Sequence, residues 1–302
     1  MNIIQAGVLA SALIITELAA ADALAPDAAN VPYGPHARNV LDVWTVKDAK
    51  APTPLVVFIH GGGFRAGDKS DYEKPQYIQP LLNAGIACAS INYRNVLHAP
   101  VPDILRDCAR AVQLIRSRAK EWNIDPQRIG GWGGSAGACS VLWLGSHDDL
   151  ANPQSPDPVS RQSSRLSAVV LIATQATLDV TRWASFMDEP RPEWKTKSEE
   201  AALSLYNAKS QAEFNTPKMK ELLADCDMLR LIGKGDAPVF CVNVVPDGPS
   251  KDVNQYMHHP RHAEAIRKAC EAAGVPCTVH PGRGQQAELA AGQWIIGQLS
   301  GK

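Results

Sequence analysis

The chain has 302 residues, of which 45% are hydrophobic and 20% are charged, and its formal net charge at pH 7 is -1. A chain of this length and apolar content can bury the core of one large α/β domain. A near-neutral net charge provides no basic field that would attract a polyanion, so we expect no nucleic-acid partner.

The first 25 residues are typical of a secretory signal peptide. Residues 6–24 are rich in Ala, Leu and Ile, and Ala23-Leu24-Ala25 forms a small-x-small sequence before Pro26. Glu17 and the short length of the run argue against a stable membrane span. We therefore predict an exported protein, periplasmic or secreted. A misplaced start codon or a disordered tail would also explain a run that no Lys or Arg precedes.

From residue 41 onwards, apolar runs bounded by turn residues alternate with helix-length amphipathic stretches. This alternation is typical of βαβ units, and it predicts an α/β protein with a mostly parallel central sheet and helices on both faces. The run at 41–44 alternates in polarity and favours an antiparallel edge strand. The strands expected to be buried lie at 54–59, 85–93, 128–132, 166–173, 238–245 and 276–280.

Helices are expected to end near Leu82 and Leu299, to begin at Ala136, and to span 103–122 and 260–273. We predict one domain over 26–302. Its longest stretch without a strand, 185–234, is a candidate small helical cap over a site, although a helical excursion packed on the sheet edge explains it equally well.

Of the seven cysteines, three lie in apolar, strand-like runs (Cys88, Cys241 and Cys277) and three in helix-like ones (Cys108, Cys139 and Cys270). Small buried hydrophobic residues explain them better than a disulfide framework does. No C-x-x-C spacing is present, so we expect no metal site and no cofactor. If the protein is exported, Cys108 could pair with Cys139 or Cys226.

The pentapeptide Gly133-Gly134-Ser135-Ala136-Gly137 follows one predicted strand and precedes a predicted helix. A serine hydroxyl is a weak nucleophile, and acyl transfer needs it on a sharp exposed turn beside a base. Gly133 and Gly137 remove side chains that would collide as a strand doubles back into a helix. The pattern therefore predicts Ser135 as a nucleophile rather than part of an ordinary glycine-rich turn.

His60-Gly61-Gly62-Gly63-Phe64 directly follows the strand at 54–59. Consecutive glycines let backbone N–H groups approach a developing negative charge, so we expect Gly62, Gly63 and Ala136 to form an oxyanion hole. A flexible loop and a phosphate cradle are the alternatives. The cradle is disfavoured because no Gly-Lys-Ser/Thr follows.

These motifs make the chain resemble the HGGG branch of the α/β-hydrolase esterases and lipases, which includes hormone-sensitive-lipase-like enzymes and feruloyl and acetylxylan esterases. The resemblance covers about 41–299, and Asn92-Tyr93-Arg94 and 125–129 are further anchors in the expected order. It implies an acid just after the strand at 238–245, where Asp247 is the first choice and Asp252 the second. A simple turn residue in 246–248 is the alternative for Asp247.

The same family places its catalytic histidine in Pro-Gly-x-Gly-His after the last strand, where this chain has Gln285. Glutamine has no titrating nitrogen and cannot accept the serine proton. We predict His259 as a relocated base, with His258 and His280 as alternatives, although each histidine could be a cap, packing or surface residue. Two further explanations stay open. One is a degenerate hydrolase that binds a small molecule without turnover, and the other is slow catalysis with Gln285 positioning water or substrate.

The sequence therefore predicts a serine hydrolase that cleaves a small-molecule or carbohydrate-linked carboxylic ester through an acyl-enzyme on Ser135. Neither the acyl-chain length nor the oligomeric state follows from the residues.

Overall fold

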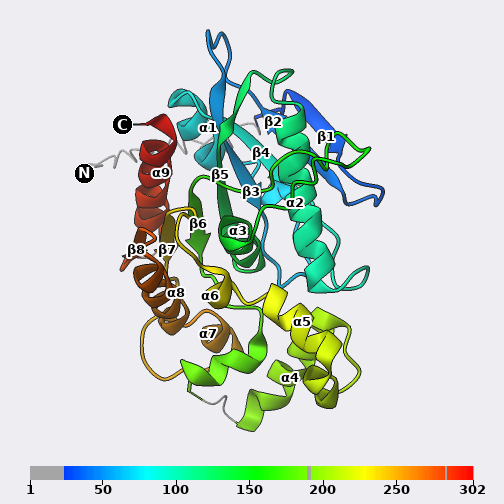
Figure 1. Cartoon of the computed structure of the whole chain (residues 1–302). Coiled ribbons are helices and arrows are strands. Elements are labelled where there is room, and N and C mark those ends of the chain that lie inside the picture. The colour runs from blue at the N-terminus through cyan, green and yellow to red at the C-terminus, as the bar shows by residue number, and fades with distance from the viewer. Residues whose placement is uncertain (1–23, 189–191, 283, 302) are drawn as a thin grey trace, which may run out of the picture.

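A computed structural model describes residues 24–188, 192–282 and 284–301. The predicted signal peptide therefore lies almost wholly outside the described residues. The described chain is built on an eight-stranded sheet with strand order β1-β2-β4-β3-β5-β6-β7-β8 (Figure 1). Strands β3 to β8 pair in parallel, whereas β2 pairs antiparallel with both β1 and β4. The predicted α/β class and mostly parallel sheet are confirmed.

The strands are short, and the central ones are apolar on both faces because helices cover both sides of the sheet. In β3, for example, all seven residues are buried. The strands are β1 Ala28–Pro32, β2 Val40–Trp44, β3 Thr53–Ile59, β4 Ala87–Ile91, β5 Ile124–Gly134, β6 Val169–Ile172, β7 Val239–Val242 and β8 Cys277–His280.

Two hydrophobic cores lie on opposite faces of the sheet. Alternate residues of β3 divide between them: Val57 belongs to one core and Phe58 to the other. The larger core is closed by α2 (Val101–Ser117), α3 (Ala136–Ser146) and α8 (Pro260–Ala273), and the smaller by α1 (Pro75–Asn83) and α9 (Gly284–Ser300).

The segment predicted as a candidate cap contains helices that gather with α7 (Val253–Met257) at one end of the sheet, the lower end in Figure 1. Tyr206 ties this group to the rest of the domain, since its hydroxyl donates a hydrogen bond of 2.7 Å to the Leu178 carbonyl oxygen. The helices of the candidate cap are α4 Pro192–Tyr206, η3 Gln211–Asn215, α5 Pro217–Asp225 and α6 Met228–Leu231, and η2 Val180–Ser185 precedes them. Elsewhere in the domain, the short helix η1 Lys69–Asp71 precedes α1.

Two expectations about element boundaries were wrong. The strand at 41–44 is antiparallel as predicted, but it is not an edge strand, because β1 pairs along its outer side. The sequence of β1, Ala-Ala-Asn-Val-Pro, is too short and too exposed to show a strand pattern. Helix α2 ends at Ser117 rather than at residue 122, because turns occupy the residues that follow. Within the described residues, no helix has the length and apolar character needed to cross a membrane.

Candidate active site

Ser135 lies on a sharp turn between β5 and α3, with backbone angles φ 51° and ψ -117°. A non-glycine residue with positive φ is strained by about 1–3 kcal/mol, and such strain persists only where the surroundings enforce it. Here Gly133 and Gly137, the two glycines that flank the turn, allow this backbone conformation. A Cβ on Gly137 would lie 1.9 Å from the Ile59 carbonyl oxygen, and one on Gly133 would lie 2.3 Å from the Gly137 carbonyl carbon. Only glycine fits at either position.

Both sides of the turn are anchored by the backbone. The Ser135 N–H donates a hydrogen bond of 2.8 Å to the carbonyl oxygen of Ile172 at the end of β6. The Ser135 carbonyl oxygen accepts one of 3.0 Å from the Cys139 N–H in α3. The side-chain hydroxyl is thereby presented at the carboxyl edge of the sheet, where ligands bind in open α/β sheets.

The glycine loop after β3 passes directly beside this turn. A Cβ on Gly61 would lie 2.8 Å from the Gly134 carbonyl oxygen and 3.5 Å from the Ser135 Cβ. Gly62 and Gly63 have φ of 94° and 60°, which favour glycine. No described group accepts a hydrogen bond from the N–H groups of Gly62, Gly63 or Ala136. These donors are thus available to a ligand at the turn.

His60 fixes the start of that loop and is fully buried. Its ring stacks on Tyr93 at 4.2 Å between centroids, and the Tyr93 hydroxyl donates a hydrogen bond of 2.7 Å to the His60 carbonyl oxygen. Arg38 Nη2 lies 3.2 Å from His60 Nε2, which must accept because a guanidinium only donates. Burial lowers the pKa of His60, and the nearby positive charge of Arg38 lowers it further, so the ring stays neutral. His60 is therefore a support of the loop.

The histidine beside Ser135 is His258, one of the two alternative bases, and not His259. Ser135 Oγ lies 2.9 Å from His258 Nε2. His258 Nδ1 lies 2.9 Å from the carbonyl oxygen of Asn254, which can only accept, so Nδ1 carries the proton. Nε2 is then unprotonated and accepts from the serine hydroxyl. Burial lowers the pKa of His258, partly offset by the hydrogen bond to Asn254. The ring is neutral and correctly oriented to take a proton.

His259 points elsewhere because it caps α8. Its Nδ1 accepts a hydrogen bond of 3.2 Å from the Arg261 N–H, and its Nε2 donates one of 2.8 Å to the Gly248 carbonyl oxygen. Asp247, the first-choice acid, is 84% exposed, and its Oδ1 lies 3.8 Å from His259 Nε2. The expected pairing of Asp247 with His259 is thus present only as a loose surface contact. The structure places neither side chain at Ser135.

The remaining candidates have local structural roles. Asp252 caps α7 by accepting a hydrogen bond of 2.8 Å from the Gln255 N–H. His280 accepts one of 3.0 Å from the Gly282 N–H in the turn after β8. Gln285 lies in the first turn of α9 with its side chain exposed. The position at which the family carries its histidine therefore belongs to a surface helix here.

Gln175, which the sequence did not single out, connects the serine and histidine segments. Its Nε2 donates a hydrogen bond of 2.8 Å to the carbonyl oxygen of Met257, the residue before His258. Its Oε1 lies 3.2 Å from the Cys139 Sγ in α3. Gln175 is buried and follows β6 without any recognisable motif, so no sequence pattern could have identified it.

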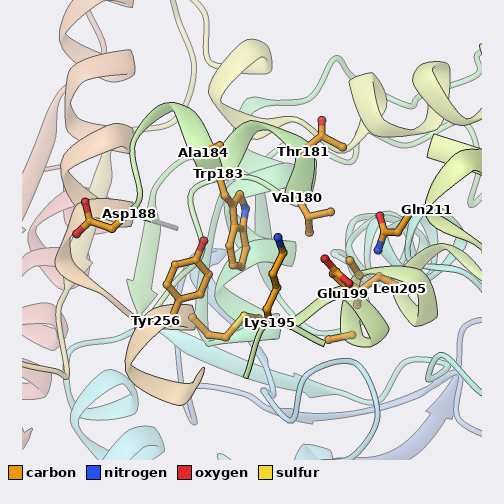
Figure 2. A pocket seen from close by; sticks show the side chains of 13 residues that line it. Val180, Thr181, Trp183, Ala184, Asp188, Lys195, Glu199, Leu205, Gln211 and Tyr256 are labelled. Carbon is orange, nitrogen blue, oxygen red and sulfur yellow. The ribbon is translucent and has the colours of Figure 1, made fainter. Parts of the chain in front are cut away.

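A cavity of about 310 Å³ is lined by residues of η2, α4 and α7. Figure 2 shows the Trp183 and Tyr256 rings on one side of it and Glu199 and Leu205 on the other, with the Lys195 side chain reaching between them. Met257 lines the cavity too, so the residue that precedes His258 forms part of its wall. Within the described ranges, no group of three or more His, Cys, Asp or Glu residues could hold a metal ion.

The strand order, the strained serine turn and the glycine loop define an α/β-hydrolase fold. The family can also be named: residues 41–244 match the family model described as BD-FAE, and since this is more than half of the chain, the protein belongs to that family.

Curated relatives include "Probable isoprenylcysteine alpha-carbonyl methylesterase ICMEL1" of Arabidopsis thaliana, 30% identical over 139 residues, which are 46% of this chain and 29% of the relative. Esterase LipQ of Mycobacterium tuberculosis is 30% identical over 135 residues, or 43% of this chain and 32% of the relative. The match thus spans less than a third of either relative.

Solved structures share the fold over most of the chain. A truncated carbohydrate esterase from gut microbiota has a TM-score of 0.68 at 20% identity, covering 93% of this chain and 99% of its own. The acetyl ester-xyloside bifunctional hydrolase of Caldicellulosiruptor lactoaceticus has a TM-score of 0.62 at 23% identity, covering 86% of this chain and 85% of its own.

Proposed function

We propose that the protein is a carboxylic ester hydrolase in which Ser135 is the nucleophile and His258 is the general base. The observation that carries this proposal is the 2.9 Å contact between Ser135 Oγ and His258 Nε2, with the tautomer of the ring set by the Asn254 carbonyl oxygen. This replaces the expected Asp247–His259 arrangement by a pair whose orienting group is a backbone carbonyl. Membership of a family with esterase relatives supports the reaction class.

In the proposed reaction, Ser135 Oγ attacks the ester carbonyl carbon while its proton moves to His258 Nε2. The N–H groups of Gly62, Gly63 and Ala136 stabilise the oxyanion. Collapse of the intermediate breaks the bond to the alcohol, which takes the proton from His258. Water, activated by the neutral ring, then attacks the acyl-enzyme and releases the acid and free Ser135.

The substrate class proposed is a small-molecule or carbohydrate-linked ester. Structural neighbours described as a carbohydrate esterase and an acetyl ester-xyloside hydrolase support it. The cavity behind Met257 offers room for part of such a substrate, with apolar walls from Trp183 and Leu205 and charged groups from Lys195 and Glu199.

The test combines active-site labelling with turnover of p-nitrophenyl acetate. An organophosphonate should add once, on Ser135, and Ser135→Ala should lose both label and turnover. His258→Ala should lower kcat by about 10²–10⁴-fold. The matched control is His259→Asn, which keeps a good helix cap for α8 and should retain activity.

The competing function is a binding protein that kept the fold without turnover. Absence of an adduct on Ser135, with hydrolysis unchanged in Ser135→Ala, would overturn Ser135 as the nucleophile and favour that alternative. Equal losses in His258→Ala and His259→Asn would overturn the assignment of the base.

A further inference from the structure

The two N–H groups that the glycine loop offers to an oxyanion, those of Gly62 and Gly63, are oriented by different contacts. A trans peptide unit is planar, so its carbonyl oxygen and the following N–H point in opposite directions. The described residues contain no cis peptide bond. The Gly62 carbonyl oxygen, in one peptide unit with the Gly63 N–H, accepts hydrogen bonds of 3.0 and 3.1 Å from the Arg65 and Ala66 N–H groups. Backbone contacts therefore fix the Gly63 donor.

The Gly62 donor depends on a side chain instead. The Gly61 carbonyl oxygen, in one peptide unit with the Gly62 N–H, lies 2.9 Å from His60 Nδ1. A carbonyl only accepts, so Nδ1 must carry the ring proton. The Tyr93 hydroxyl lies 3.1 Å from the same oxygen, but its single hydrogen has a closer acceptor in the His60 carbonyl oxygen at 2.7 Å. The orientation of the Gly62 N–H therefore depends on which nitrogen of His60 is protonated.

Arg38, in the connection between β1 and β2, determines where that proton lies. Its Nη2 donates to His60 Nε2 at 3.2 Å, and a guanidinium has no acceptor, so the proton of the neutral ring is on Nδ1. With the proton on Nε2 instead, two donors would face each other there and two lone pairs would meet at the Gly61 oxygen. Arg38 is itself held by hydrogen bonds of 2.8 Å from Nε to the Tyr93 carbonyl oxygen and 2.9 Å from Nη2 to the Gly67 carbonyl oxygen.

The His60 ring is confined to this position. It is fully buried and stacks on Tyr93 with an angle of 16° between the ring planes. The loop also closes tightly over it, since a Cβ on Gly67 would lie 2.5 Å from His60 Nδ1. Because the ring is held in place, the position of its proton decides whether the Gly61 carbonyl oxygen has a donor.

We propose that Arg38 is a positioning residue for the ester hydrolysis: by donating to His60 Nε2 it keeps the proton on Nδ1, and the resulting hydrogen bond to the Gly61 carbonyl oxygen aims the Gly62 N–H at the oxyanion. Arg38 touches no reacting atom and lies 22 residues before His60, outside the glycine motif. This inference rests on the proposed function, since it assigns a role to an oxyanion donor.

The first test measures the tautomer by NMR and needs no turnover. The eight histidines of the full chain are labelled with ¹⁵N, and the His60 signals are those absent from His60→Asn. At neutral pH, His60 should have a protonated Nδ1 and an unprotonated Nε2, and Arg38→Met should shift the proton toward Nε2. A native ring protonated at Nε2 would overturn the proposal whether or not the variant folds. A tautomer that does not respond to Arg38→Met would overturn it too.

The second test is the hydrolysis of p-nitrophenyl acetate. An oxyanion donor acts in the transition state, and loss of one costs about 10²–10³-fold in kcat, so its misorientation in Arg38→Met should lower kcat by about 10–10²-fold with little change in KM. The matched control is Arg110→Met. Arg110 Nε donates a hydrogen bond of 2.7 Å to the Tyr33 carbonyl oxygen, and its other hydrogen-bond partners also lie outside the glycine loop. Arg110→Met should retain kcat, and equal losses in the two variants would contradict the proposal.

A double-mutant cycle tests whether the effect passes through His60. In His60→Asn, the side-chain amide supplies a donor near the former Nδ1 position, and this donor does not depend on a tautomer. Arg38→Met should therefore lower kcat by a smaller factor in His60→Asn than in the native chain. The same factor in both backgrounds would overturn the route through the ring.

The outcome for Ser135→Ala separates this inference from the proposed function. If Ser135→Ala keeps full turnover, the proposed function fails, and with it the role of Arg38 in hydrolysis. If Ser135→Ala is inactive and Arg38→Met keeps its full kcat, only the present inference fails.

Discussion

Removing the carboxylate of Asp247 should hardly change turnover, although the family pattern places its orienting acid there. The Asp247 side chain is 84% exposed and meets His259 at 3.8 Å, whereas His258 is oriented by the Asn254 carbonyl oxygen at 2.9 Å. Asp247→Asn keeps the shape of the side chain and removes its charge, so it tests only the electrostatic role.

The expected loss of kcat differs by orders of magnitude between Asp247 as the acid of a triad and Asp247 as an exposed surface residue. Loss of the acid in a Ser-His-Asp triad lowers kcat by about 10⁴-fold, since the histidine then adopts the wrong tautomer. That corresponds to about 5.4 kcal/mol at about 1.36 kcal/mol for each tenfold change. An exposed ion pair contributes about 0–1 kcal/mol, which limits the expected change in kcat to about five-fold. The contrast is large enough for a simple ester assay.

The assay is p-nitrophenyl acetate hydrolysis from pH 5 to pH 8, with Asp252 as the comparison. Asp252→Ala removes the cap of α7, which costs about 1 kcal/mol and loosens the helix that carries the Asn254 carbonyl. It should lower kcat more than Asp247→Asn does, and Asp252→Asn, which still caps, should restore activity. A loss of about 10³-fold or more in Asp247→Asn would refute the carbonyl-oriented base.

Four further outcomes are expected. Burial lowers the pKa of His258, and the neutral ring is the base. We therefore expect kcat/KM to rise with pH and to reach half its plateau value below pH 6.5, the ordinary pKa of histidine. A midpoint above about pH 6.5 would contradict this. Gln175→Ala should lower kcat about tenfold or more with little change in KM, since the carbonyl before the base loses its donor. Gly137→Ala should destabilise the protein by at least about 3 kcal/mol in urea unfolding, whereas Gly292→Ala, at an unobstructed position of α9, should be neutral or stabilising. Gln285→His should add no activity, since that side chain is exposed on α9; a marked gain would show that the base had been lost.

Most of the fold was predictable because buried parallel strands are continuous apolar runs. The runs at 54–59 and 238–245 correspond to β3 and β7. Two of the elements that sequence analysis did not predict, β1 and α7, have only five residues each. A five-residue segment contains too few positions to display a periodic pattern. Whether such a short segment is buried and capped depends on contacts with distant parts of the chain.

The same distinction between local and distant determinants applies to the residues of the candidate site. Ser135 and the glycine loop are marked by local geometry, because positive φ and close backbone contacts demand glycine at fixed spacing. The choice between His258 and His259 is not local. It depends on where α7 ends and α8 begins, and successive side chains at that junction point in different directions. Gln175 acts through one hydrogen bond to a backbone carbonyl, which leaves no trace in the sequence pattern.

With the base before β8, the chemistry of the proposed site is complete by residue 258, and the last strand and helix contribute no reacting group. Helix α9 is held to the domain by its buried side chains, Ala287, Ala291, Ile295 and Leu299, and by contacts of Glu288 with Tyr77 and of Trp294 with Phe240. Its exposed positions, Gln285 among them, are free to vary through mutation without loss of function. That C-terminal region is accordingly a suitable place for surface redesign or for attaching a tag.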